Sequence, residues 1–350
     1  MSMCMPALAR QTFRDFELLL VDNGSTDGSP AYIRELEKTG LLLETASDAA
    51  PSFIPVRGLL LPENTGFSGA VNAGIQAAFG DYVLLLNNDT EATPDFMEQL
   101  VRTMEKGSSN PYRLFAVSPK MVQLYHKELL DDAGDGYTLL GWAFQRGVGQ
   151  SIDTPQFNRR CSVFSACAGA SLYRKALLER IRLKDGVYFD PLHFAYLEDL
   201  DVSYRARLHG YQILYEPEAV IYHVGSGTSG SRYNSFKVRL AARNSVYLNY
   251  KNMPLLQLCL NLPGLVCGCL IKQLFFVKKG FGRDYASGLW EGLSTRKHCQ
   301  KQAFRWSALP RYLAIELRLL ADSFSYVEDF LRRRLKQKAA PEKQRTEKNL

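Results

Sequence analysis

The chain has 350 residues, of which 46% are hydrophobic, and a formal net charge of +7. This composition excludes a mostly disordered protein and allows one large catalytic domain with an appendage. Its seven cysteines form no CxxC pair, and their odd number argues against a full disulfide framework, so we expect a protein of the reducing cytoplasm.

The first predicted unit is a strand, a polar turn and a helix. The apolar run 16–21 is typical of a buried strand, and it ends at Asp22. A helix over 30–39 follows, with proline at its first position and glycine after its last. A glycine-rich turn with Asn64 and Gly66 then opens another helix, and its glycines permit close backbone approach to a phosphate or ribose.

A second buried strand is predicted over 82–86, and it is followed by Asn87, Asn88 and Asp89. The carboxyl ends of parallel strands form the ligand crevice of an open α/β sheet, so the polar residues after both strands should face one pocket. An acid has little structural reason to end an apolar strand, and a hard cation such as Mg²⁺ or Mn²⁺ would supply one. The alternative is a simple turn towards a helix over 94–104.

Three acids, Glu198, Asp199 and Asp201, follow an apolar and aromatic segment. Helical spacing pairs Asp201 with Arg205, which leaves Glu198 and Asp199 at the helix start, where the helix dipole stabilises anions. A carboxylate there can act as a general base towards a hydroxyl. The alternative is a capping acid without chemistry.

Five segments share a family pattern, in family order and at family-like spacing. They are QTFRDFELLLVDNGSTDGS (11–29), LPENTGFSGAVNAGI (61–75), GDYVLLLNNDT (80–90), AGASLYRK (168–175) and FAYLEDLDVSYRARLHGY (194–211). On these residues the chain resembles bacterial family 2 inverting glycosyltransferases of the rhamnosyltransferase-like branch. The resemblance implies the GT-A nucleotide-diphospho-sugar transferase fold, an α/β fold with a Rossmann-like mixed sheet flanked by helices.

The resemblance also implies a donor site for a nucleotide-diphospho-sugar. Asp22 resembles the acid that binds the nucleotide base, and Asn64 with Gly66 resembles the loop beside it. The implied reaction is a single displacement with inversion, in which Asp199 takes the proton of the acceptor hydroxyl. Glu198 would support this base or contact the sugar.

A metal site is implied at the end of the second strand. Asn87, Asn88 and Asp89 take the place of the family's DxD motif, with Asp89 as the metal-binding acid and Asn88 near the ribose or diphosphate. Asn87 replaces the first acid, which weakens the case for two carboxylate ligands. His223, after the predicted strand 219–222, resembles a histidine that completes the metal site, and the alternative is an ordinary strand-end histidine. The expected cofactor is a divalent cation, Mg²⁺ or Mn²⁺.

An acceptor site is expected in a loop over 129–149, where the indole of Trp142 would suit stacking against a sugar. The acids Asp131, Asp132 and Asp135 in this loop lack the ligand spacing of a calcium-binding loop, so we interpret them as a solvated turn. The expected acceptor is a hydroxyl of a lipid-linked or polysaccharide glycan of the cell envelope, and the transferred sugar could be rhamnose.

Two rival functions compete with the transferase. A nucleotidyltransferase would need a basic, glycine-rich nucleotide signature near the N-terminus, which is absent. A catalytically impaired nucleotide-sugar-binding protein or scaffold is the stronger alternative. The family begins with an apolar strand before the helix that ends near Gln11, whereas this chain begins inside that helix. The first strand is therefore expected to be missing.

We divide the chain into an N-terminally truncated catalytic domain over 1–250, a basic amphipathic helical region over 251–338, and a disordered tail over 339–350. From residue 251 onwards there are 19 Lys and Arg against 8 Asp and Glu, a net charge of +11. No nucleic-acid-binding motif accompanies these charges, so an anionic membrane surface is the expected partner. The protein should lie on the cytoplasmic face of the cell membrane.

The segment 253–277 is long and apolar enough to suggest a membrane span. However, its polar residues fall on one narrow helical face, and Pro263-Gly264 is expected to break the run. A helix that lies in the membrane interface, or packs on the catalytic domain, is therefore favoured over a span. The QxxRW motif of processive synthases, found at 302–306, is interpreted as coincidence because it follows this segment, about a hundred residues beyond Asp199.

Overall fold

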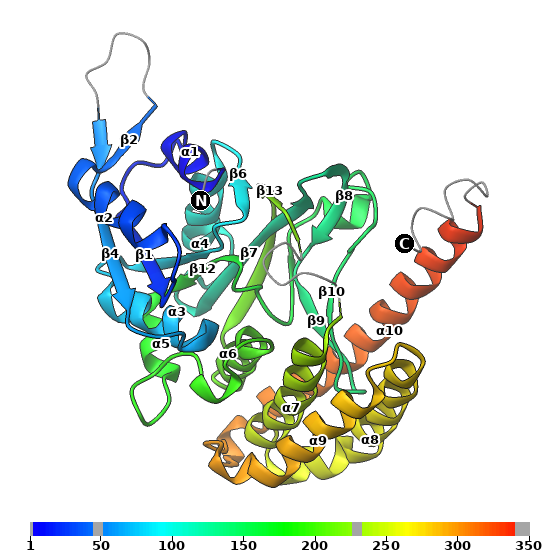
Figure 1. Cartoon of the computed structure of the whole chain (residues 1–350). Helices are drawn as coiled ribbons and strands as arrows, with labels where there is room; N and C mark the ends of the chain where they lie inside the picture. Colours follow the sequence, from blue (N-terminus) through cyan, green and yellow to red (C-terminus); the bar gives the residue numbers. More distant parts are fainter. Residues whose placement is uncertain (1–2, 45–51, 226–232, 340–350) are drawn as a thin grey trace.

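The computed structural model of the protein describes residues 3–44, 52–225 and 233–339, with side chains up to residue 332. Of the predicted tail at 339–350, residue 339 is the last residue of a helix, and residues 340–350 lie outside the described residues. Helices flank a mixed sheet, and four longer helices follow it in the chain (Figure 1). All seven cysteines are free thiols.

The N-terminal part follows the predicted order with small shifts. Its elements are α1 (Cys4–Ala9), β1 (Leu18–Asn23), α2 (Ser29–Thr39), β2 (Leu41–Leu43), β3 (Ser52–Ile54), β4 (Val56–Leu61), α3 (Gly66–Ala77) and β5 (Tyr82–Leu86). Strand β1 begins two residues later than expected and pairs in parallel with β4 in a sheet of its own. Helix α2 ends at Gly40, whose φ of 70° favours glycine.

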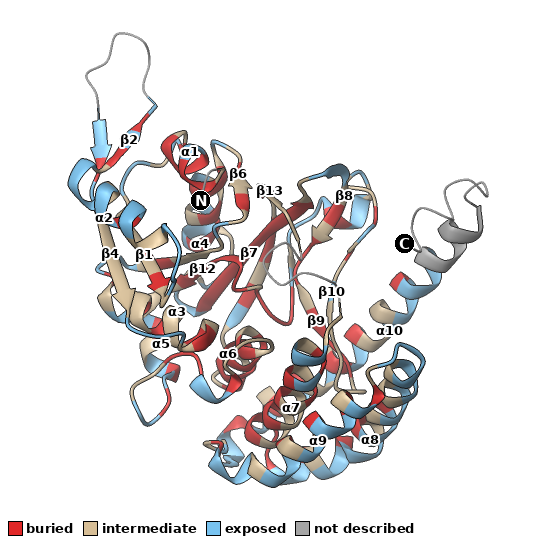
Figure 2. Ribbon diagram, in the orientation of Figure 1, coloured by how far each residue is buried: buried red, intermediate tan, exposed pale blue. Residues whose placement is uncertain are grey.

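The main sheet has the strand order β11-β13-β7-β12-β5, with β6 paired to β13 and β8 to β7. The strands are β6 (Thr90–Ala92), β7 (Leu114–Gln123), β8 (His126–Asp132), β11 (Cys161–Ser162), β12 (Ala170–Arg174) and β13 (Gln212–His223). The core helices are α4 (Phe96–Lys106), α5 (Lys175–Ile181) and α6 (Glu198–Leu208). Apolar clusters with α1, α2 and α4 and with α3, α5 and α6 cover the sheet strands, so β7 is buried over nine of its ten residues (Figure 2).

The segment 129–149 is not the loop that we expected. It contains the end of β8 and an antiparallel hairpin of β9 (Asp135–Tyr137) and β10 (Ala143–Gln145). Its strands are only three residues long, which is too short for a clear alternation of apolar and polar residues. The hairpin extends from the main sheet towards the C-terminal helices (Figure 1).

The C-terminal helices are α7 (Ser235–Asn252), α8 (Leu255–Lys278), α9 (Gly282–Thr295) and α10 (Leu309–Ala339). The boundary placed at residue 250 falls within α7 and stays a prediction. The expected break at Pro263 is wrong, because α8 is continuous through it. Pro263 is on the exposed side of α8, where the backbone carbonyl that loses its partner is near solvent.

Candidate active site

The donor end of the site lies where β1 leaves the sheet. The Asp22 carboxylate is buried and accepts a hydrogen bond of 3.0 Å from the Ser25 backbone N–H. The Asn23 amide donates to Asn64 Oδ1 at 3.0 Å, and the same Asn64 oxygen accepts from the Gly66 N–H at 2.9 Å. The structure therefore brings Asp22, Asn64 and Gly66 together. Asn23, which joins the two loops, was missed, although it directly follows Asp22.

The polar turn after β5 faces the end of β13. His223 Nε2 lies 3.6 Å from Asp89 Oδ1, and His223 Nδ1 lies 2.7 Å from Asp131 Oδ2. Burial alone would lower the pKa of His223, but hydrogen bonds with Asp131 and Asp89 raise this pKa to about 9. The Asn87 backbone N–H donates to the Gly169 carbonyl, which ties the turn, including Asn88, to the start of β12.

The pair of Asp89 and His223 fits a divalent cation. A carboxylate oxygen and an imidazole nitrogen 3.6 Å apart can both reach one ion. Asp131 binds the other ring nitrogen, an arrangement that orients metal-ligating histidines in proteins. The interpretation of Asp131 as part of a solvated turn is therefore wrong, because β8 pairs with β7 and carries this acid to the end of β13.

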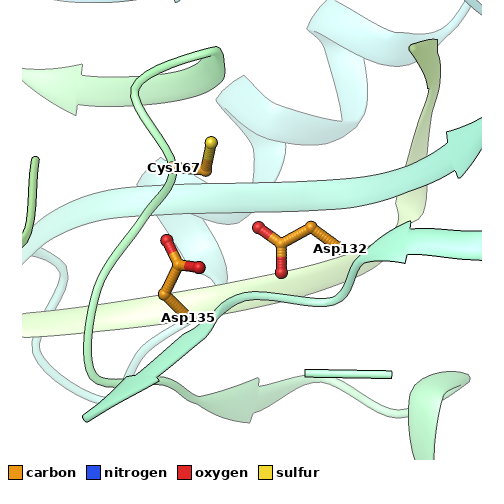
Figure 3. A group of neighbouring side chains, drawn as sticks. All are labelled: Asp132, Asp135 and Cys167. Carbon is orange, nitrogen blue, oxygen red and sulfur yellow. The ribbon is translucent and has the colours of Figure 1, made fainter. Parts of the chain in front are cut away.

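Two further acids from this segment lie next to a thiol (Figure 3). The ligand atoms of Asp132, Asp135 and Cys167 lie within 4.8 Å of one another. Asp132 is fully buried, and neither of its oxygens has a hydrogen-bond partner among the described residues. Burial and the nearby Asp131 charge raise its pKa well above the usual value. Asp132 is thus not solvated, and the raised pKa values of Asp132 and Asp135 favour the protonated form of both carboxyl groups.

The predicted base stands at the first turn of α6, as the helix signals indicated. Asp199 accepts hydrogen bonds from the Ala168 N–H at 3.3 Å and the Leu200 N–H at 2.7 Å. Burial raises the pKa of Asp199, and these two donors limit the rise. Asp199 also raises the pKa values of Asp132 and Asp135, which shows that the acids share one region. A carboxylate with a raised pKa is a better proton acceptor.

Glu198 is more buried than its neighbour in α6. Its side chain is 7% exposed, and Oε2 has no hydrogen-bond partner within the described part of the chain. Burial and the adjacent Asp199 charge raise the pKa of Glu198 well above its usual value. This environment favours a neutral carboxyl group, so Glu198 is better suited to donate a hydrogen bond than to accept a proton.

The loop before α6 has an unusual backbone that one buried amide holds in place. Phe194, Tyr196 and Leu197 have φ values of 59°, 70° and 66°, which are strained for residues with side chains. The Asn244 amide of α7 donates to the carbonyls of His193, Ala195 and Tyr196, each at 2.8 Å. The sequence carried no signal for Asn244, which resembles any polar residue in a helix.

A buried ionic network fixes α6 against α7. The predicted pair of Asp201 and Arg205 is present at 3.0 Å. Lys251, which is fully buried, joins Asp201 at 2.9 Å and Asp190 at 2.6 Å. Burial would raise the pKa of Asp201, but the Lys251 and Arg205 cations hold it well below its usual value.

Trp142 and the QxxRW residues lie elsewhere. The Trp142 indole N–H donates to the Gly268 carbonyl of α8 at 3.2 Å, and its ring packs edge-on against Tyr326 of α10. Its role in acceptor binding stays a prediction without support from this placement. Gln302 and Arg305 lie beside Leu208, at the opposite end of α6 from the predicted base. Because an 11-residue helix is about 16 Å long, these residues are far from Asp199.

Comparison with known proteins identifies the family. Residues 3–182, about half of the chain, match the model described as glycosyl transferase family 2. The chain belongs to this family. A 101-residue stretch is 37% identical to the undecaprenyl-phosphate 4-deoxy-4-formamido-L-arabinose transferase of Pectobacterium carotovorum, over 29% of this chain and 27% of that protein. A 98-residue stretch is 35% identical to the uncharacterized glycosyltransferase YibD of Escherichia coli, over 28% and 24%.

The chain spans about a quarter of the length of the curated family members that it matches. The solved structure of GalNAc-T7 with UDP, GalNAc and Mn²⁺ is similar with a TM-score of 0.51 and 15% identity. That match covers 69% of this chain and 43% of GalNAc-T7. At this identity the likeness concerns the fold, and the predicted GT-A fold is confirmed. The protein is a family 2 glycosyltransferase.

Proposed function

We propose that the chain moves one sugar from a nucleotide-diphospho-sugar to a hydroxyl of a lipid-linked or polysaccharide acceptor, with inversion at the anomeric carbon. The observation that carries the proposal is a row of interacting side chains from the end of β5 to the start of α6. Asp89 and Asp131 flank His223, and Asp132 is within electrostatic range of both Asp131 and the proposed base Asp199. A leaving-group site and a proton acceptor are thus in one region.

In this proposal the chain's own residues divide the work between donor and acceptor. Asp22 and the loop of Asn64 and Gly66 hold the nucleotide, beside Asn87 and Asn88. The Asp199 carboxylate takes the proton from the acceptor oxygen as that oxygen attacks the anomeric carbon. Binding both substrates here removes much of the entropic barrier.

Asp89 and His223 would hold a divalent cation, Mg²⁺ or Mn²⁺, with Asp131 orienting the imidazole ring. When bound, such a cation offsets the negative charge that develops on the departing nucleoside diphosphate. Glu198, kept neutral by burial, would donate a hydrogen bond to the sugar or to Asp199.

The acceptor and the sugar are inferred from similarity to known proteins, not from the side chains of the candidate site. One matching protein is named for transfer to undecaprenyl phosphate, which supports a lipid-linked acceptor in the cell envelope. A membrane-associated position on the cytoplasmic face would bring the site to such a lipid, without a role for nucleic acid. Rhamnose as the sugar, the rhamnosyltransferase-like branch and the missing first strand remain predictions. The non-catalytic scaffold is not favoured, because the chain matches the family 2 glycosyltransferase model and a relative named as a transferase.

A donor screen with Mn²⁺ or Mg²⁺ tests the proposal. The assay measures the release of nucleoside diphosphate from nucleotide-diphospho-sugars in the presence of envelope lipid extract. It compares the wild type with Asp199→Asn and with the surface control Asp185→Asn. We expect Asp199→Asn to lower turnover by roughly 100-fold or more while nucleotide binding persists, since a general base contributes on that scale. The proposed reaction is refuted if the wild type binds nucleotide but forms no free nucleoside diphosphate with any combination of donor and lipid extract.

A second pair of variants tests the cation. Asp89→Asn should weaken Mn²⁺ binding, measured by calorimetry without any donor, whereas Asp27→Asn at the exposed turn before α2 should leave it unchanged. Equal Mn²⁺ affinity in wild type and Asp89→Asn would remove the cation from this site without touching the assignment of the base.

A further inference from the structure

Helix α8 is packed with its polar side towards the protein. Gln257 and Asn261 are 6% and 5% exposed, and their amides donate to Glu316 Oε1 of α10 at 2.6 Å and 2.8 Å. Gly268 faces the β9–β10 hairpin so closely that a Cβ atom there would lie 2.1 Å from the Leu140 carbonyl oxygen. The narrow polar face found in the sequence is therefore the face that holds α8 to the rest of the molecule.

The other faces of α8 carry many exposed residues (Figure 2). Within the described residues 255–277, each exposed side chain is aliphatic, aromatic, proline or cysteine. Six leucines are 51–70% exposed, namely Leu255, Leu256, Leu260, Leu262, Leu270 and Leu274. By length and composition the helix could cross a membrane, and 22% of its most apolar window is buried. A contiguous exposed apolar surface of this kind marks an interaction site.

Helix α10 presents a second apolar stripe beside α8. Leu313, Leu317, Leu320, Phe324 and Val327, spaced by three or four residues, are 43–69% exposed. Among the described residues 313–327, no charged side chain is exposed. The opposite face of α10 is anchored, with Leu319 fully buried. Because Glu316 binds both polar side chains of α8, the two helices are side by side.

We propose that α8 and α10 form a membrane-binding face that lies in the interface of an anionic bilayer without crossing it. The inference deepens, and rests on, the proposed function, since a lipid-linked acceptor would be found at the same surface. Lipid is the occupant that fits, because the face is apolar throughout and is bordered by the exposed cations Lys278 and Lys279, which suit anionic head groups.

The contacts on the polar face explain why α8 would not span. A span would place Gln257, Asn261 and Glu316 in hydrocarbon or break their hydrogen bonds, and either change is costly. The same packing links the face to the site. The β9–β10 hairpin carries Asp135 near the acids and Trp142 on the Gly268 carbonyl of α8, so it runs from the active site to the membrane-binding face.

Vesicle flotation of the purified full chain tests the membrane-binding face. The probes are vesicles of phosphatidylcholine alone and of phosphatidylcholine with phosphatidylglycerol, without donor. We expect the wild type to float with the anionic vesicles and to be released by an alkaline carbonate wash. Leu260→Glu with Leu270→Glu should lower the partition coefficient roughly 100-fold, because acidic groups replace exposed leucines that the bilayer would bury. Lys278→Gln with Lys279→Gln should lower it roughly tenfold, and only on anionic vesicles.

Leu42→Glu is the matched control and should float as the wild type does, because Leu42 is an exposed leucine on β2, at 54% against 69% for Leu260 and 61% for Leu270. Four outcomes would overturn the inference: no flotation of the wild type, equal flotation of the Leu260 and Leu270 variant, retention after the carbonate wash, which indicates a span, or a dimer that the same substitutions dissociate. Since no sugar donor is present, a chain that floats but transfers nothing would contradict the proposed function alone.

Discussion

The buried amide of Asn244 should control both the stability of the protein and the position of its base. Replacement by leucine keeps the side chain's size but removes the donors to the carbonyls of His193, Ala195 and Tyr196. The amide has two N–H donors for these three carbonyls, so two of the carbonyls share one N–H. Each lost donor costs about 1 kcal/mol net, so Asn244→Leu should lower the free energy of unfolding by about 2 kcal/mol. The strained loop that these carbonyls belong to leads directly into α6 and Asp199.

Urea unfolding followed by circular dichroism measures the stability term. Ser245→Ala, the next residue of α7, is the control, because its hydroxyl bonds only to the Ala242 carbonyl of its own helix. It should stay within about 0.5 kcal/mol of the wild type. With an active donor, Asn244→Leu should also lower turnover by roughly 100-fold at unchanged donor affinity, since a misplaced base is that costly. A stability loss below about 1 kcal/mol would refute the reasoning.

Three further changes test the packing around the site. Lys251→Met should cost about 3–5 kcal/mol in urea unfolding, because it strips a buried carboxylate of a cation. Folding lowers the pKa of Asp201, so the stabilising effect of the Lys251–Asp201 pair should persist above about pH 4 and fade below it. A steady loss of this stabilising effect from pH 8 to 5 would contradict this origin. Asp132→Asn should leave the free energy of unfolding unchanged at pH 4 and raise it by about 1 kcal/mol at pH 8, because a carboxyl group whose pKa rises on folding destabilises the folded state as pH increases. A lower free energy of unfolding for the variant at pH 8 would instead indicate a partner that stabilises the Asp132 carboxylate. Gly288→Ala should lower the free energy of unfolding by about 2 kcal/mol, since a Cβ atom at this position of α9 would lie 2.2 Å from the α7 backbone. Gly28→Ala is the control and should cause no such loss, because the space around Gly28 is open. Equal unfolding midpoints for the two variants would contradict the close approach of α7 and α9.

Local patterns were enough for the elements that carry the recognised motifs. The strand over 82–86, the helix end at Gly40, the start of α6 at Glu198 and the pair of Asp201 and Arg205 all appear as expected. Each depends on residues within a few positions of one another, through apolar periodicity, chain-ending residues or helical spacing. Two of them, the strand over 82–86 and the helix end at Gly40, lie within residues 3–182, which match the family.

The remaining part of the site depends on contacts between distant segments. Asp131 and His223 are 92 positions apart, and Asn244 is 51 positions from His193. Neither pair has a local signature, so Asp131 was assigned to solvent and Asn244 was not noticed. Pairing of β8 with β7 decides the position of Asp131, and packing of α7 on the loop before α6 decides the role of Asn244.

Helix α8 separates the two kinds of information most clearly. Its sequence determined a helix with one narrow polar face, because that pattern follows from 3.6 residues per turn. However, the spacing of polar residues alone does not determine whether the polar face contacts water or protein. Only the tertiary structure decided that this face turns inward, because the amides of Gln257 and Asn261 find their partner in Glu316 of a helix more than 50 residues away.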